Sequence, residues 1–132
     1  MLPIFALLLF AVIDFGLAFG GMISLRSDVN AGARLASVSQ TDPSCSTAAN
    51  PMICTIDDRI GSLPGVQSGS LQVGVALPDG LTAGDNVVVC AQATLQSTSG
   101  ITSTFLNGRT VHVSSELRLE QDAGYSAGGL AC

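Results

Sequence analysis

Residues 1–25 read MLPIFALLLFAVIDFGLAFGGMISL and predict a long apolar helix at the start of the chain. Asp14 is the single formally charged side chain in it. A helix of this length and apolarity can cross the hydrocarbon core of a bilayer, which is roughly 30 Å thick. A cleaved secretory signal begins with basic residues, and none precedes Arg26, so we expect an anchor that is retained. The pattern leaves open whether a charged leader precedes Met1.

The composition limits the size and the partners of the protein. The chain has 132 residues, enough for one small domain, with 47% hydrophobic and only 11% charged residues. Ten acidic residues outnumber five basic ones, which gives a net charge of -5. Because no basic face is available to neutralise phosphates, nucleic acid is not an expected direct partner.

Apolar and small residues at helical spacing continue the first helix beyond the membrane segment, to about Val38. The residues that share this face are Met22, Leu25, Val29, Gly32, Ala33 and Ala36. The small residues among them allow another surface to approach closely. We therefore divide the chain into an N-terminal helix at 1–38, with a membrane-spanning part at 1–25 and an amphipathic part at 26–38, and a head at 39–132.

A short second helix is predicted in the head. Thr55 resembles an N-cap, Asp57 and Asp58 follow as acidic residues of a first turn, and Pro64 ends the helix after about Leu63. Adjacent helix positions point about 100° apart, so the two aspartates are better explained as helix-start residues than as a catalytic pair.

The rest of the head has the alternation of β-strands. Three strands are predicted at 71–77, 86–95 and 110–120, and the apolar start of the second indicates a central strand covered on both faces. Three strands need further support, so we expect the amphipathic half of the helix to cover a three- or four-stranded antiparallel sheet. Residues 97–107 are rich in Ser, Thr and Gly and predict an exposed, mobile loop that faces a partner.

Four cysteines, Cys45, Cys54, Cys90 and Cys132, favour disulfides if the head lies outside the cytoplasm. Three pairings are possible. We favour Cys45 with Cys54, which closes a short loop, and Cys90 with Cys132, which ties the tail to the central strand. Buried free thiols remain an alternative. Because no C-x2-C pair occurs, no metal site is expected.

Catalytic motifs are missing from the sequence. The single histidine, His112, falls on the polar face of a strand and is expected to be an exposed surface residue. No G-x-S-x-G, Walker or H-E-x-x-H pattern occurs, so we expect neither an enzyme nor a cofactor. The spacing of Gly16, Gly20 and Gly21 is a weak indication of a helix-packing face in the membrane.

Asp14 is the strongest candidate functional residue. A carboxylate within a membrane segment is costly and is usually retained for a function. We expect it to pair with a cation of a neighbouring subunit, such as an N-terminal amine or an arginine, and so to direct assembly. The alternative is a protonated or snorkelling acid near the membrane surface.

The N-terminal third resembles the TadE-like family, the minor pilins or pseudopilins of tight adherence (Tad/Flp) type IV pilus systems. The resemblance rests on residues 2–16, LPIFALLLFAVIDFG, with the proline, leucine-rich stretch and acid-Phe-Gly signature of the family. Residues 30–36, NAGARLA, are similar to its Gly-Ala-Arg segment. The chain departs from the family at Leu17, where an arginine is common.

The resemblance implies an α+β, pilin-like fold: a long N-terminal helix packed on a small, disulfide-stapled antiparallel sheet. It implies a single-pass protein of the cytoplasmic membrane with an extracytoplasmic head, which joins or primes a pilus. Its implied partners are other pilin subunits and the pilus assembly machinery, in a hetero-oligomer, and the surrounding membrane lipid. The candidate assembly residues are Asp14, Phe15, Gly16, Gly20, Arg26, Gly32, Ala33 and Arg34. Two alternatives stay open: a membrane-anchored binding module unrelated to fibre assembly and, more remotely, a small tethered hydrolase that would need His112.

Overall fold

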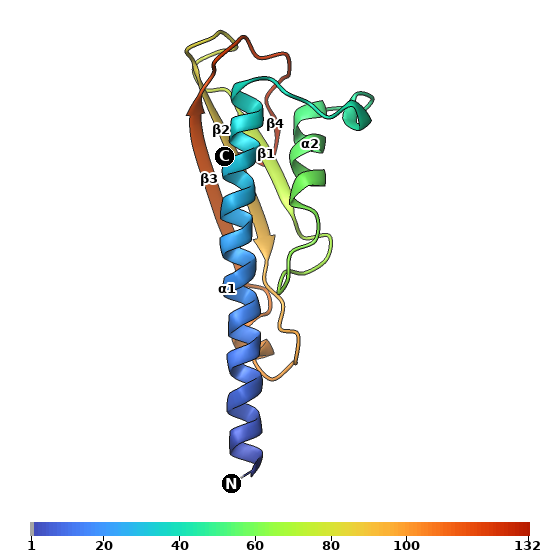
Figure 1. Cartoon of the computed structure of the whole chain (residues 1–132), viewed down its shortest axis with the longest axis vertical. Coiled ribbons are helices and arrows are strands. Elements are labelled where there is room, and N and C mark those ends of the chain that lie inside the picture. The colour runs from blue at the N-terminus through green and yellow to red at the C-terminus, as the bar shows by residue number, and fades with distance from the viewer. Residues whose placement is uncertain (1) are drawn as a thin grey trace.

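One long helix runs the length of the molecule (Figure 1). The computed structural model describes the backbone of residues 2–132 and the side chains of residues 3–132, so the part of the predicted anchor at Met1 lies outside the described residues. Helix α1 extends over Leu2–Ser37, close to the predicted end at Val38. It ends where Ser39 adopts a left-handed φ of 51°, with the amides of Ser39 and Gln40 donating to the carbonyls of Ala36 and Leu35. This pattern is a Schellman cap.

The core-facing side of α1 forms a continuous seam with helical spacing. Its buried members are Asp14, Ala18, Gly21, Leu25, Val29, Gly32, Ala33 and Ala36. The seam therefore begins well inside the predicted membrane segment, at the acid itself. Below Asp14, the large apolar side chains at residues 4–13 are exposed, and from Asp14 upward the helix packs along one side against its own head.

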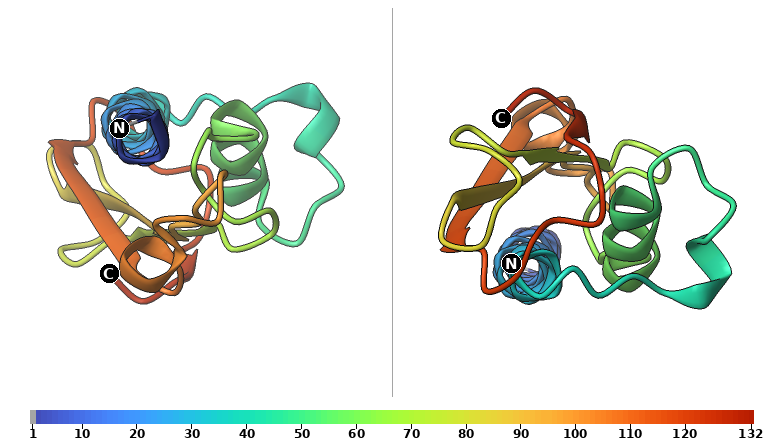
Figure 2. Two further views of the ribbon diagram at one scale, coloured as in Figure 1. Left: turned by 90° about the horizontal axis from the view of Figure 1, so that it is seen from below. Right: turned by 90° about the horizontal axis from the view of Figure 1, so that it is seen from above.

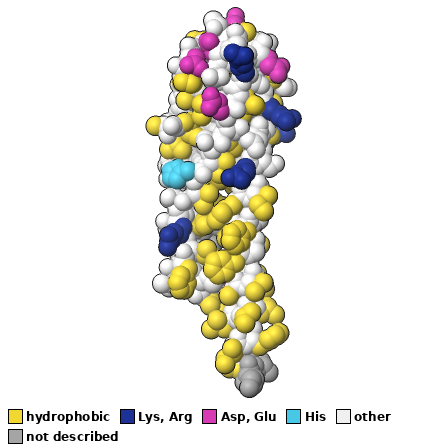
Figure 3. All heavy atoms as spheres, turned by 90° about the vertical axis from the view of Figure 1, so that its left-hand side faces the viewer, with side chains coloured by type: hydrophobic (Ala, Val, Ile, Leu, Met, Phe, Trp, Pro, Cys, Tyr) yellow, Lys and Arg dark blue, Asp and Glu magenta, His cyan; other side chains and the backbone are white. Residues whose placement is uncertain are grey.

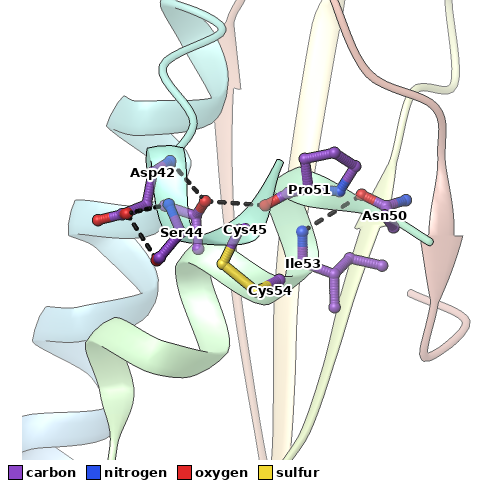
Figure 4. Close-up of a disulfide and its surroundings, with 8 residues drawn as sticks. Asp42, Ser44, Cys45, Asn50, Pro51, Ile53 and Cys54 are labelled. Atoms are coloured by element: carbon purple, nitrogen blue, oxygen red, sulfur yellow. Dashed lines mark hydrogen bonds between the residues drawn. A yellow bond between two sulfur atoms is a disulfide. The ribbon is translucent and has the colours of Figure 1, made fainter. Parts of the chain in front are cut away.

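The second helix begins earlier than the sequence predicts. Helix α2 covers Pro51–Ile60, and the side chain of Asn50 caps it by accepting from the amide of Ile53 (Figure 4). The prediction of Thr55 as the N-cap is therefore wrong, because the pair Asn50 and Pro51 supplies a stronger start, a cap followed by a proline at N1. Thr55 instead donates to the carbonyl of Pro51 and accepts from the amide of Asp42.

The predicted strands exist and are each shorter by one or two residues. β1 is Gln72–Ala76, β2 is Asn86–Thr94 and β3 is Thr110–Arg118, while a two-residue strand, β4 at Gly128–Gly129, comes from the glycine-rich tail. The sheet is antiparallel with the order β3-β2-β1-β4, so β2 is central as predicted. The sequence of β4 has no alternating pattern from which this strand could be predicted.

Helices α1 and α2 lie on the same face of the sheet, α1 over β2 and β3 and α2 beside β1 (Figure 2). Alternate β2 residues, such as Val87 and Val89, are fully buried beneath α1, whereas Cys90 faces the other side and meets the C-terminal tail. The main core consists of Leu25, Val29, Ala33, Ala36, Met52, Ile56, Ile60, Val73, Val75, Val87, Val89, Ala91, Ala93, Leu119 and Tyr125.

Both favoured disulfides are present. Cys45 in the 3-10 helix η1 (Pro43–Cys45) is bonded to Cys54 of α2 (Figure 4). Cys90 of β2 is bonded to Cys132. The alternative of free thiols is therefore wrong, since all four cysteines are paired. The structure confirms the general layout of an apolar N-terminal helix on a small antiparallel sheet with two disulfides.

Candidate functional site

The candidate site surrounds Asp14, the lowest residue of the α1 seam. Only 2% of its surface is exposed, although the neighbouring apolar residues Ile13 and Phe15 are 46% and 41% exposed. The side chain is covered by the segment between β2 and β3, which descends below the sheet and lies beside α1 (Figure 1). We call residues 96–108 of this segment the α3 loop.

Four hydrogen bonds from the α3 loop converge on the Asp14 carboxylate. Oδ2 accepts from the hydroxyls of Ser97 at 2.8 Å, Ser99 at 2.6 Å and Thr102 at 2.5 Å. Oδ1 accepts from the backbone N–H of Ser99 at 3.0 Å. Hydrogen bonds to an ionised acceptor are the strong ones, and several together satisfy a carboxylate that the surroundings hide from water.

Apolar packing reinforces these hydrogen bonds. Within the α3 loop, the one-turn helix α3 covers Ser103–Leu106, and Leu106 is 6% exposed. It forms a small second core with Ala18 of α1 and Leu95 at the end of β2. The prediction of an exposed loop at 97–107 is therefore wrong for Thr102 and Leu106, which are buried, because the loop hydroxyls have a buried acid to bind. Its mobility stays a prediction.

The structure supplies Asp14 with partners from its own chain. The described residues place three hydroxyls and one amide of the same chain on the carboxylate. The expected pairing with a cation of a neighbouring subunit stays a prediction. The alternative of a snorkelling acid does not fit, since the side chain is buried against the head.

The other predicted assembly residues fall into two groups. Gly32 and Ala33 are buried in the core of the head, where a Cβ at Gly32 would meet Ile56 at 3.0 Å. Phe15, Gly16, Arg26 and Arg34 are exposed, and a Cβ added at Gly20 would meet nothing within 4 Å. Only the second group lies on an outer surface, so the structure does not bring the predicted residues together as one site.

The α3 loop donors were missed because their sequence pattern is ordinary. Ser97, Ser99 and Thr102 lie in a run of small polar residues that is typical of any surface connection. The usable signal was the combination of an acid in an apolar helix with a hydroxyl-rich segment elsewhere. That combination does not specify which segment reaches the acid, because the pairing spans 83 to 88 positions in sequence.

A large apolar surface surrounds the site on the outside of α1. Phe15 and Phe19 lie with ring centroids 6.4 Å apart, and Phe19 and Ile23 are 59% and 72% exposed. One face of the molecule is predominantly hydrophobic in its lower half and carries its acidic side chains near the upper end (Figure 3). Exposed apolar surface of this extent marks contact with lipid or with another protein.

Other candidate chemistry finds no support in the geometry. His112 lies exposed on β3, as predicted, and Asp57 and Asp58 are exposed on α2. Among residues 3–132, no three His, Cys, Asp or Glu side chains gather closely enough to hold a metal ion. α1 is the element of the described chain that is long and apolar enough to span a membrane.

Comparisons with known proteins assign no family to this chain. A scan of protein-family models, a search of curated proteins and a search of solved structures each found no match.

Proposed function

We propose that this chain is a minor pilin or pseudopilin subunit that helps to assemble or prime a Tad/Flp-type type IV pilus. The observation that carries the proposal is the division of α1 into two sides. One side is the seam from Asp14 to Ala36, which packs on the head. The other side keeps Phe15, Phe19 and Ile23 exposed along the same stretch.

This division of α1 suits a subunit whose exposed apolar side contacts lipid in the membrane and other helices in a fibre. A helix that served only as a core element would bury its large apolar residues, and a simple tether would not need a head packed along half its length. Here the exposed side is apolar from Ile4 to Ile23 and is available to a bilayer or to neighbouring apolar helices. In this proposal Phe19 and Ile23 make the lateral contacts, and Asp14 holds the α3 loop in place.

The test is the amount of fibre sheared from cells that lack the gene, probed for the major pilin. We expect fibres to be lost, to be restored by the wild-type gene, and not to be restored by a Phe19→Ser/Ile23→Ser variant that is present in the membrane at the wild-type level. Leu81→Ser is the matched control, because Leu81 is a comparably exposed apolar residue, 51% exposed, outside α1. It should restore fibres fully.

Persistence of normal fibres in the deletion strain would refute the assembly role. A membrane-anchored binding module would then be the better function, and one observation favours it. The outer face of the sheet has a shallow pocket of about 270 Å³ beside the Cys90 to Cys132 disulfide, lined in part by His112, Ser114 and Leu130. Substitutions at this pocket would then be the ones to change function.

A further inference from the structure

The α3 loop combines inward-bonded hydroxyls with two exposed apolar side chains. The hydroxyls of Ser97, Ser99 and Thr102 donate to Asp14. On the outside, Ile101 is 45% exposed and Phe105 is 68% exposed, beside exposed polar residues. These two apolar side chains suit a surrounding less polar than water.

Many backbone amides of the α3 loop also have hydrogen-bond partners. The amides of Ser97, Gly100 and Ile101 donate to side chains within the loop, and that of Ser99 donates to Asp14. Turn hydrogen bonds use the amides of Ser103, Phe105, Leu106 and Asn107. Irregular backbone is costly near lipid because its polar groups lack water, and internal hydrogen bonds lower that cost.

The distribution of charge favours lipid over a protein as the neighbour of this loop. No residue from 95 to 108 is charged, and Arg109 follows directly. On α1 the same order holds, since Arg26 is the first basic residue after the apolar segment. An uncharged zone followed by arginines matches the order of membrane interior and anionic headgroups at a membrane surface.

The contacts of the loop with α1 place it at the level of the predicted membrane segment. The hydrogen bonds to Asp14 and the contact of Leu106 with Ala18 fix the loop at the lower end of the head. The uncovered helix below it, residues 3–13, is about 16 Å long at 1.5 Å per residue. Because the hydrocarbon core is roughly 30 Å thick, a bilayer that α1 spans extends up to the loop.

We propose that the α3 loop is a second membrane-contacting element, which enters the bilayer interface beside α1 with Ile101 and Phe105 among the upper acyl chains. The Asp14 hydrogen bonds keep the loop folded there and satisfy the hydroxyls of Ser97, Ser99 and Thr102. This inference rests on the membrane-anchoring part of the proposed function and not on fibre assembly.

The chain has no tryptophan, so one introduced tryptophan reports a single position. Three single variants of the full chain are reconstituted at low density in vesicles of phosphatidylcholine and phosphatidylglycerol: Phe105→Trp in the loop, Phe10→Trp on the uncovered helix and Leu81→Trp as an exposed control remote from it. All three native side chains are at least 45% exposed, so the fold should tolerate the change. Emission, quenching by acrylamide and quenching by lipids brominated on the acyl chain are then measured.

We expect Trp emission at position 105 to be blue-shifted, protected from acrylamide and quenched by brominated lipid, at a shallower depth than at position 10. Position 81 should show water-exposed emission. If position 10 is quenched by lipid and position 105 behaves like position 81, the loop proposal is wrong and the anchor stands. Protection from acrylamide at position 105 without lipid quenching would also overturn it, because a protein contact would then cover the loop. Failure of lipid quenching at position 10 would refute the anchor and, with it, the loop proposal.

Discussion

Asp14 shows how one buried acid organises a segment more than eighty residues away. Its carboxylate accepts from three hydroxyls and one amide of the α3 loop, and Thr102 is the most buried of the hydroxyl donors. The hydroxyl-rich composition of the loop therefore has a specific use. Replacing one donor by an apolar isostere leaves an acceptor lone pair of the carboxylate unsatisfied.

We predict that Thr102→Val lowers the melting temperature of the full chain in detergent by several degrees and exposes the α3 loop to protease. Thr104→Val is the matched control, since Thr104 is exposed in the same loop and its hydroxyl has no hydrogen-bond partner within residues 3–132. The control should melt like the wild type. Equal effects of the two substitutions would contradict a specific role for the Asp14 hydrogen bonds.

Tyr125 provides a pH-dependent test of the core. Its hydroxyl donates to the carbonyl of Ala36 at 2.8 Å, and burial raises the pKa of Tyr125 to about 12. The unfolded chain loses this proton near the ordinary value of about 10, whereas the folded chain retains it. Stability is therefore complete below about pH 10 and decreases as the pH rises from about 10 to about 12.

Few other side chains titrate in this alkaline range, because the chain has one tyrosine and no lysine, and all four cysteines are paired. We expect the urea midpoint of the wild type to fall across this alkaline range and that of Tyr125→Phe to change much less. Phenolate absorbance in the folded protein should report the raised pKa directly. A Tyr125 that titrates near pH 10 in the native state would contradict its burial.

At the scale of elements, α1 and the connection after α2 approach each other closely at Gly21. A Cβ at Gly21 would overlap the carbonyl of Pro64, whereas one at Gly20 would meet nothing within 4 Å. The two adjacent glycines thus have different roles, although the sequence grouped them as one packing face. Gly21 permits the contact between helix and head, and Gly20 lies away from it.

We predict that Gly21→Ala destabilises the protein by about 1–3 kcal/mol, the usual cost of overpacking a close contact. Gly20→Ala should be neutral or stabilising by up to about 1 kcal/mol, since alanine is the better helix former. Urea denaturation of both variants in the same detergent measures the difference. A similar loss in both would indicate that the contact at Pro64 does not constrain α1.

At the scale of the molecule, the two disulfides close loops of different length. Cys45 and Cys54 are separated by 9 positions, whereas Cys90 and Cys132 are separated by 42. The longer loop also fixes the tail that contributes β4, whose two glycines pair with Gly74 and Val75. Loss of the second disulfide should therefore release more chain.

We predict that Cys90→Ser/Cys132→Ser costs about 4 kcal/mol of unfolding free energy and Cys45→Ser/Cys54→Ser about 3 kcal/mol, following the chain-entropy relation. Urea denaturation of each double variant beside the oxidised wild type gives the two values. Hydrogen exchange at the amide of Leu130, which donates to Val73, should increase only in the first variant. A larger loss from the short loop would contradict this order.

Local patterns were sufficient for much of this protein. The long apolar helix, the three alternating strands and the central place of β2 follow from hydrophobic spacing, and the two disulfides followed from spacing together with the need to hold the tail. These features depend on residues close together in the chain or on a single pairing choice. The start of α2 was missed because Asn50 and Pro51 outcompete Thr55 as a helix start, which is also a local signal.

Hydropathy along the chain is enough to show that α1 carries an acid in an apolar surrounding, and that this acid is costly unless something binds it. It does not show which groups of the same chain bind the acid. The hydroxyls that do so depend on where a distant loop descends beside the helix, and that position follows from the sheet register and the packing of Leu106 on Ala18. Hydrogen bonds form between groups that the fold brings within about 3 Å, and no spacing along the chain encodes that distance.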